Sequence, residues 1–143
     1  MEETECVFCK IVKRKIKCPI IFENERFIAF LDINPVNFGH ALIVPKEHIE
    51  TLLTAKSRIL REMMPIAKRI ADAVMKNQKA GGFNLCMNNY RAAGQLIPHL
   101  HLHIIPRYDA DFVTLDKQKT KKYLPGELEK LSSELKRILK EDK

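Results

Sequence analysis

The residues best suited to chemistry form a row of alternating histidines between positions 99 and 105. His99, His101 and His103 are each followed by an aliphatic residue, and they account for three of the five histidines in the chain. Imidazole titrates near neutral pH, so these side chains can act as nucleophiles, as proton donors and acceptors or as metal ligands. On a β-strand they would share one face, about 6.6 Å from one to the next, while the aliphatic residues face the core. The row therefore predicts a functional strand, either catalytic or metal-binding.

A second group with chemical potential is the pair Cys6 and Cys9, which has the Cys-x-x-Cys spacing of a metal knuckle. The sequence has no second pair of this kind, which excludes a zinc ribbon, and it lacks the thioredoxin-like βαβ setting of a redox pair. Histidines are the ligands that remain to complete a metal site. Two reduced thiols on a short helix are the alternative interpretation.

Five short apolar runs predict the strands that must carry these groups. They occupy residues 19–23, 26–32, 40–45, 83–87 and 99–105. The first two runs are separated only by Asn24-Glu25, which indicates a hairpin. Because most of the runs are joined by hairpins or loops, the pattern favours an α+β fold with an antiparallel sheet.

One long helix is expected between the third and fourth strands, around residues 58–78. Apolar residues recur there at three- and four-residue steps, and Ser57 is the expected N-cap. Pro65 lies inside the pattern and should kink or split the helix, and Gly81-Gly82 should end it.

Two further helices are expected at the ends of the chain. The first is a short helix or turn over residues 6–16. The second is an amphipathic helix after Pro125-Gly126, and its apolar face is marked by Leu128, Leu131, Leu135 and Ile138. Both would lie outside the sheet.

The composition is typical of one globular domain, with 143 residues of which 45% are hydrophobic and 30% are charged. No apolar run approaches the roughly 20 residues of a membrane span. The acidic residues 1–5 are unlike the start of a signal peptide. We therefore expect a cytoplasmic protein with reduced cysteines and no membrane partner.

The formal charge of +7 is concentrated at the two ends of the chain. Residues 10–17 contain five bases and no acid, and residues 117–143 contain nine bases and five acids. A basic surface attracts polyanions, but Lys-rich solvated faces reach such a charge without any partner. The Lys-rich stretch 117–122 is expected to be a linker or mobile loop. The middle of the chain, which holds the histidine row, is close to neutral.

The histidine row resembles the mark of the histidine triad (HIT) family of nucleotide hydrolases and transferases, His-φ-His-φ-His-φ-φ, where φ is an apolar residue. Residues 99–105 match every position, and Ala93-Gly94-Gln95 and Asn88 stand where the family has its Gly-Gln and Asn. Segments 30–35 and 39–49 resemble the family's first half. The resemblance covers about residues 6–107.

This resemblance implies a single HIT domain over residues 1–143. The implied fold is a five-stranded antiparallel sheet with one long helix, a short N-terminal helix and a C-terminal helix. Residues 108–143 would form a basic extension that contains the last of these helices.

The resemblance also implies catalytic roles. His101 would attack the α-phosphorus of a nucleotide, His103 would contact the phosphate oxygens, and Gln95 would hydrogen-bond the phosphate or the bridging atom. His40 would be an outer partner of the triad. Transferases of the family have Gln in place of His103, so this residue favours hydrolysis over transfer.

Nucleotide-binding residues follow from the same resemblance. Asp32 would accept hydrogen bonds from the ribose hydroxyls, and Asn88 would bind ribose or phosphate. The apolar residues expected around the base are Phe8, Ile11, Phe30 and Ile33. Leu96 is a departure, because the family's best-known branch has Ser there in contact with the α-phosphate, so that branch's substrate preference does not transfer.

In a subset of the family, a zinc ion joins such a cysteine pair to two histidines. The corresponding ligands here would be Cys6, Cys9, His48 and His99. Four nitrogen and sulfur ligands make a closed site that is structural, not catalytic. We therefore expect zinc as a cofactor that pins the N-terminal segment against the histidine row.

The expected function is hydrolysis at the α-phosphate of a nucleotide conjugate through a covalent nucleotidyl-histidine. Nucleoside phosphoramidates and dinucleoside polyphosphates are the substrates that the family suggests, with adenosine as the usual nucleoside. The expected partners are this small nucleotide and a second copy of the chain in a homodimer; nucleic acid is not favoured. The alternatives are deadenylation of nucleic-acid ends and a nucleotide-binding interaction protein with little catalysis.

Overall fold

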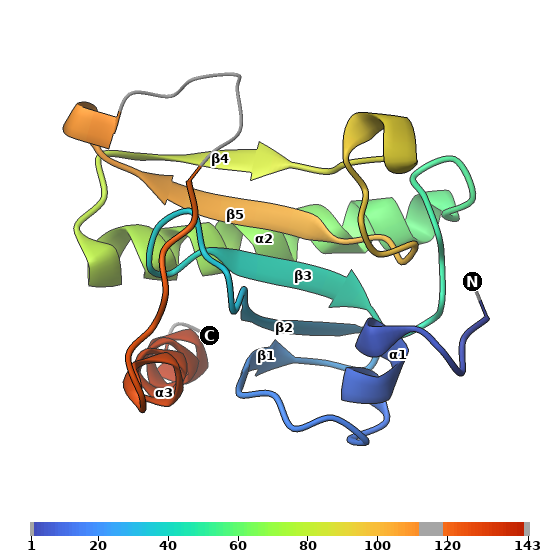
Figure 1. Ribbon diagram of the computed structural model, residues 1–143, viewed down its shortest axis with the longest axis horizontal. Coiled ribbons are helices and arrows are strands. Elements are labelled where there is room, and N and C mark those ends of the chain that lie inside the picture. Colours follow the sequence, from blue (N-terminus) through green and yellow to red (C-terminus); the bar gives the residue numbers. More distant parts are fainter. Residues whose placement is uncertain (1, 112–118, 142–143) are drawn as a thin grey trace.

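A five-stranded antiparallel sheet forms the centre of the computed structural model, which describes residues 2–111 and 119–141 (Figure 1). The strands are β1 (Ile20–Glu23), β2 (Phe27–Leu31), β3 (Ala41–Pro45), β4 (Gly82–Cys86) and β5 (Leu102–Arg107). Their order in the sheet is β1-β2-β3-β5-β4. The helices are α1 (Val7–Val12), α2 (Ser57–Gln78) and α3 (Glu127–Glu141), with short 3-10 helices η1 (Arg91–Ala93) and η2 (Asp109–Asp111). The predicted α+β fold is confirmed.

The two faces of the sheet carry separate hydrophobic cores. The larger core joins α2 and α3 to residues such as Phe27 and Ile43, and the smaller core joins α1 to Phe30 and Leu42. Figure 1 shows α1 in front of the sheet and α2 behind it. Every residue of β2 and β3 is buried, which explains their continuous apolar runs, because strands covered on both faces need no polar side.

The hairpin between β1 and β2 forms without the glycine that such turns prefer. The side-chain oxygen of Asn24 accepts hydrogen bonds from the backbone N–H groups of Arg26 and Phe27, at 3.0 and 2.8 Å. An Asn side chain can replace a backbone acceptor in this way. The predicted hairpin is confirmed, and β1 lies at one edge of the sheet.

The long helix α2 corrects three expectations. It is not split at Pro65, since it runs without interruption from Ser57 to Gln78, and a kink at this residue stays a prediction. Pro65 is exposed, so the group left without its backbone hydrogen bond can face solvent. Lys56, with extended backbone, is the N-cap in place of Ser57, and Lys79 ends the helix in the left-handed conformation before Gly81-Gly82.

Strand β5 begins three residues later than the histidine row predicts. The N–H of His99 donates to the Ile97 carbonyl and the N–H of Leu100 donates to the Ile49 carbonyl, so this part of the chain bonds to a loop and not to the sheet. Pairing with β3 starts at Leu102. The regular strand therefore carries only His103, while His99 and His101 precede it.

The C-terminal helix α3 packs on β1, β2 and α2 through Leu131, Leu135 and Leu139. Leu128 and Ile138, which were also expected on the apolar face, are only partly buried. Part of the expected loop 117–122 lies outside the described residues. No described helix is long and apolar enough to cross a membrane.

Candidate active site and metal centre

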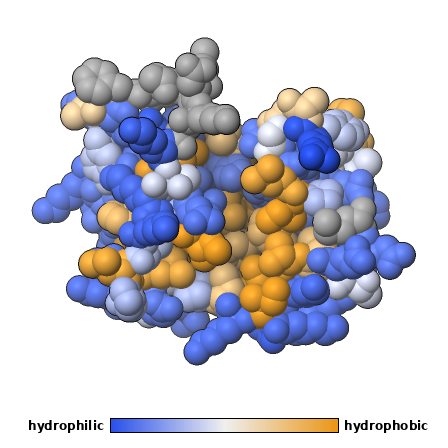
Figure 2. All heavy atoms as spheres, viewed as in Figure 1, coloured by the Kyte–Doolittle hydropathy of each residue, from blue (hydrophilic) through white to orange (hydrophobic). Residues whose placement is uncertain are grey.

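A cavity of about 460 Å³ opens on the α1 face of the sheet and reaches the end of the histidine row. Figure 2 shows apolar side chains gathered around a hollow on this face. We call this the nucleotide cavity, after the residues expected there. The expected residues that line it are Phe8, Ile11, Phe30, Asp32, Ile33, Asn88, His101 and His103.

His101 is held in one tautomer by the backbone. Its Nδ1 lies 2.7 Å from the carbonyl oxygen of His99, which can only accept a hydrogen bond, so Nδ1 carries the proton. Burial lowers the pKa of His101, against the opposing effect of that hydrogen bond. The ring is therefore neutral near pH 7, and its Nε2 keeps a free electron pair. This is the state that a nitrogen nucleophile requires.

His103 belongs to a directed chain of hydrogen bonds that begins at a backbone N–H. The N–H of Val36 donates to His40 Nδ1 at 3.1 Å, and His40 Nε2 lies 2.9 Å from His103 Nδ1. Burial lowers the pKa of both His40 and His103 to about 4, so both rings are neutral. His40 Nε2 must then donate to His103 Nδ1. The proton of His103 is left on Nε2, where it can be donated to a ligand.

Asp32 stands at the end of β2, beside these rings. One carboxylate oxygen accepts from the N–H of Asn34 at 2.9 Å, and the other lies 3.8 Å from His40 Nε2. Burial raises the pKa of Asp32, and the neighbouring imidazoles oppose this effect. The carboxylate can accept further hydrogen bonds from hydroxyl groups within the cavity.

Gly39 sets the direction of the chain just before His40. It has a φ of +90°, and a Cβ at this position would lie 2.9 Å from the Gln78 side chain. Its N–H donates to the hydroxyl of Tyr123 at 3.1 Å. A larger residue would push the loop away from α2 and move His40 with it.

The Gln95 side chain makes two hydrogen bonds to the backbone, and its expected contact with phosphate stays a prediction. Its side-chain N–H donates to the Glu50 carbonyl and its oxygen accepts from the Tyr90 N–H, both at 2.7 Å. Its neighbours Gly94 and Leu96 line the nucleotide cavity, and Leu96 is 89% exposed. The Gln95 amide therefore ties the loop after β4 to the segment that follows His48.

Sequence reasoning missed the contribution of the C-terminal extension to this cavity. Thr120 lines its rim. Next to it, the Lys121 N–H donates to the Pro35 carbonyl at 2.7 Å, and the Tyr123 ring packs on Phe38 with centroids 5.0 Å apart. No local pattern around Thr120 could have revealed this, because the contact joins segments about 85 residues apart in the chain.

Cys6, Cys9, His48 and His99 form a compact cluster beside the cavity. Each offers one ligand atom, and these atoms lie within 4.8 Å of one another. Cys6 Sγ is 3.3 Å and Cys9 Sγ is 3.5 Å from His99 Nδ1, and Cys9 Sγ is 3.2 Å from His48 Nδ1. Four ligand atoms at such separations can surround one small ion.

The chemistry of this cluster fits zinc. His99 Nε2 lies 2.8 Å from the Pro45 carbonyl and so carries the proton, which leaves the Nδ1 electron pair directed at the cysteines. Burial and the neighbouring Cys6 raise the pKa of Cys9 to about 12, so two thiolates at this position need a cation between them. Two sulfur and two nitrogen ligands are a set that structural zinc prefers.

Phe8 connects the metal cluster to the nucleotide cavity. It lies between the two cysteines in the sequence, and its ring centroid is 5.8 Å from that of His99 and 5.1 Å from that of His101. It also packs on Phe30 at 5.6 Å. An ion that holds Cys6 and Cys9 would therefore hold one wall of the cavity in place.

The sequence of the chain is similar to a known protein family and to characterised members of it. The family described as the HIT domain matches residues 13–110. Adenosine 5′-monophosphoramidase HNT1 of Saccharomyces cerevisiae is 41% identical over 107 residues, or 75% of this chain and 65% of that protein. Adenylylsulfatase HINT3 of Arabidopsis thaliana is 39% identical over 109 residues, or 76% of this chain and 55% of that protein.

A solved structure supports the same placement. The zinc-bound histidine triad family protein from Mycobacterium smegmatis superposes with a TM-score of 0.84 at 30% sequence identity. The match covers 98% of this chain and 96% of that one. The sequence match to the two named enzymes covers less than two thirds of either, so the likeness to them concerns the domain.

Proposed function

This chain belongs to the HIT domain family, and from that premise we propose that it hydrolyses adenosine nucleotide conjugates at the α-phosphate through a nucleotidyl-His101 intermediate. The observation that carries the proposal is the state of His101 in the nucleotide cavity. Its Nδ1 is bonded to the His99 carbonyl, and its Nε2 electron pair is free.

The first step is displacement at phosphorus. His101 Nε2 forms a bond to the α-phosphorus while the bond from phosphorus to the leaving group breaks, and the leaving group takes up a proton from solvent water. In the second step, a water oxygen bonds to the same phosphorus and releases a proton to solvent as the bond to Nε2 breaks. Nucleoside monophosphate is released and His101 returns to its neutral form. Splitting one displacement into two steps is the general advantage of covalent catalysis.

The His40–His103 pair supports charge that develops during these steps. His103 Nε2–H is a fixed donor, because the chain of bonds from Val36 determines its tautomer. A donor oriented before reaction stabilises negative charge on phosphate oxygens without reorganising in the transition state. His103 is therefore proposed as the group that contacts the phosphate.

The remaining walls suit a nucleoside. Phe8, Ile11 and Phe30 form an apolar wall for the base, and Asp32 lines the same cavity with one carboxylate oxygen 3.8 Å from His40 Nε2. A carboxylate there can accept hydrogen bonds from both ribose hydroxyls. The two enzymes named above act, by their names, on adenosine derivatives, which supports adenosine as the nucleoside.

Phosphoramidates are the proposed substrate class. The yeast relative is named a monophosphoramidase, and the plant relative is named an adenylylsulfatase. Both names describe a small leaving group on the α-phosphate. Leu96 offers no hydrogen bond at the cavity mouth, so the leaving group is expected to be held by few specific contacts.

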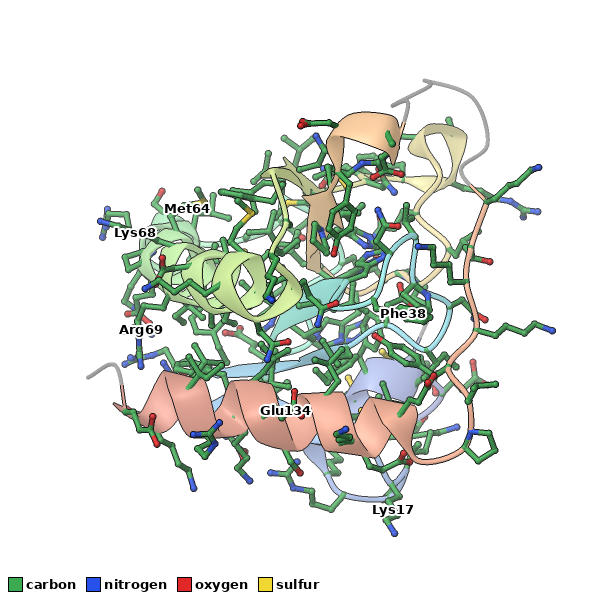
Figure 3. The ribbon with its side chains drawn as sticks, turned by 90° about the vertical axis from the view of Figure 1, so that its left-hand side faces the viewer. Lys17, Phe38, Met64, Lys68, Arg69 and Glu134 are labelled. Carbon is green, nitrogen blue, oxygen red and sulfur yellow. The ribbon has the colours of Figure 1, made fainter. Side chains whose placement is uncertain are left out.

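The structural metal and the homodimer are part of the same proposal. Zinc held by Cys6, Cys9, His48 and His99 would fix α1 and take no part in the chemistry. β4 lies at the free edge of the sheet with Phe83 and Leu85 exposed, and Met64 projects from α2 into solvent (Figure 3). We propose these surfaces as the contact with a second copy, which light scattering of the purified protein can detect.

The decisive experiment is to trap the intermediate. The protein is mixed with adenosine 5′-phosphoramidate labelled in the adenosine and quenched within milliseconds in alkaline denaturant, which preserves a phosphorus–nitrogen bond. We expect label on the wild-type chain and none on the His101→Gly variant. Diadenosine tetraphosphate and adenosine 5′-phosphosulfate, tested in parallel, rank the substrates. Absence of turnover with all three substrates would contradict the hydrolase assignment.

A further inference from the structure

A second and larger cavity, of about 790 Å³, lies outside the proposed active site. It is formed where the segment after α1, the edge strand β1 and the end of α3 meet. Its cationic side chains come from three separate parts of the chain and are Arg14, Lys15, Lys17, Arg69, Lys136 and Lys140. We call this the basic cavity. Figure 3 shows Arg69 and Lys17 on opposite sides of α3, the helix to which Lys136 and Lys140 belong.

Much of the excess positive charge of the chain lies around the basic cavity. The segment 10–17 and the C-terminal helix lie at opposite ends of the sequence, yet both contribute to one site. Within residues 2–111 and 119–141, the only carboxylate in the lining is Glu23, and it is paired with Arg14 and Lys46. Among the described residues, the four lysines of the cavity have no ion-pair partner. Clustered unpaired cations in a concave site attract a polyanion more strongly than the same charges spread over a surface.

The other walls of the basic cavity are apolar. They include Ile16, Ile20, Ile21, Phe22 and Leu139. Arg69 is held among them, because its guanidinium donates to the Leu139 carbonyl at 2.8 Å and lies 5.4 Å from the centre of the Phe22 ring. A ligand that satisfies this lining needs anionic groups for the lysines and apolar groups for the remaining surface. Single-stranded nucleic acid has both, whereas an inorganic polyanion has only the charges.

We propose that the basic cavity binds a segment of single-stranded nucleic acid, with its phosphates on the lysines and its bases against the apolar wall. The site is distinct from the nucleotide cavity, although Cys18 lines both. It does not depend on hydrolysis at His101. It departs from the expectation that nucleic acid is not favoured as a partner, since the two basic ends of the chain meet in this cavity.

The test compares two triple variants that remove the same charge. The cavity variant is Lys15→Ala/Lys17→Ala/Lys136→Ala, and the control is Lys56→Ala/Lys68→Ala/Lys79→Ala. All six lysines are exposed, so both variants should fold, which thermal unfolding verifies. Binding of a fluorescein-labelled 12-nucleotide oligothymidylate is measured by anisotropy between 50 and 300 mM salt, with the full chain.

The cavity variant should bind the oligonucleotide at least about tenfold more weakly, and the slope of log affinity against log salt should fall by about 2, since each phosphate contact on a single strand contributes about 0.7. The control variant should stay within about threefold of wild type. Hydrolysis of adenosine 5′-phosphoramidate should be the same in all three proteins, because none of these lysines lines the nucleotide cavity.

Three results would overturn the proposal. The first is no measurable binding by the wild type at 50 mM salt. The second is an equal loss in both variants, which would assign binding to overall charge. The third is competition by inorganic polyphosphate as effective, per phosphate, as that of unlabelled oligothymidylate, which would show that the apolar wall contributes nothing and that the cavity recognises charge alone.

Discussion

His99 and His101 are two residues apart, and the structure gives them opposite orientations. Each ring is held by one backbone carbonyl, but Pro45 accepts from Nε2 of His99 whereas His99 accepts from Nδ1 of His101. The free electron pair of His99 therefore faces Cys6 and Cys9, and that of His101 belongs to the nucleotide cavity. The position of the hydrogen-bond acceptor, and not the type of residue, therefore decides what each imidazole can do.

The surroundings of the two rings differ as well. His99, Cys6 and Cys9 are at most 2% exposed, and all four members of their cluster can serve as ligands, so no position is left for a substrate. His101 borders an open cavity. The fully enclosed metal cluster is suited to stabilising the fold, and the open nucleotide cavity is suited to turnover.

The largest effect is expected on the hydrolysis rate, from a substitution in the nucleotide cavity. His101→Ala should lower the hydrolysis of adenosine 5′-phosphoramidate by at least about 10³-fold, because removal of a nucleophile abolishes the covalent route. The thermal midpoint should change little. Steady-state kinetics and thermal unfolding check both. Hydrolysis within tenfold of wild type would show that another group attacks the phosphorus.

Substitutions in the metal cluster should instead lower the thermal stability of the protein. Cys6→Ser/Cys9→Ser should abolish bound zinc and lower the thermal midpoint by about 10 °C, since loss of a structural metal removes binding energy that is coupled to folding. Elemental analysis and calorimetry measure these quantities. Cys18→Ser/Cys86→Ser removes the same number of thiols and serves as the control. Equal zinc content in the two double variants would contradict the assignment of Cys6 and Cys9 as zinc ligands.

The hydrogen-bonded chain behind His103 predicts a dependence of stability on pH. His40 is 3% exposed, and burial lowers its pKa from 6.5 to about 4. The unfolded chain takes up this proton below pH 6.5, whereas the folded protein does so only near pH 4. The free energy of unfolding should therefore fall by about 3 kcal/mol as pH decreases through this window, and His40 should contribute no change above it.

Urea unfolding between pH 4.5 and 7.5 measures this effect, with His40→Asn as the comparison. The amide oxygen of Asn can accept from the Val36 N–H but cannot titrate, so the variant should show a shallower decrease. An equal slope in both proteins would mean that other groups account for the acid sensitivity.

The smallest effect concerns Gln95, which ties the loop after β4 to the segment after His48. Gln95→Met should cost about 2 kcal/mol, because the Tyr90 N–H and the Glu50 carbonyl each lose a hydrogen bond. We expect kcat to fall by less than tenfold. A drop in kcat above a hundredfold with an unchanged thermal midpoint would instead assign Gln95 to the phosphate.

Much of the fold could be predicted from local pattern. The strands, the long helix and the β1–β2 hairpin all leave periodic or turn signals in the sequence. The errors lie where distant groups compete with local preference. The start of β5 is delayed because Leu100 bonds to Ile49, and α2 continues through Pro65 because that residue faces solvent.

Some features of the candidate site could also be predicted from local sequence, and others could not. The spacing of the histidines and of Cys6 and Cys9 is written in the sequence, and it indicated which residue types would meet. The engagement of Gln95, the presence of Thr120 at the cavity rim and the joining of two basic chain ends around one cavity were not predictable. Each depends on contacts between segments that are far apart along the chain.

The amino-acid sequence specifies the chemical groups that are present: three alternating imidazoles, a thiol pair and the apolar strands that carry them. How these groups are used depends on the folded arrangement. Imidazole has two nitrogens, and which one keeps its electron pair depends on where a carbonyl from elsewhere in the fold is placed. That placement is a matter of packing between distant segments, which no local spacing encodes.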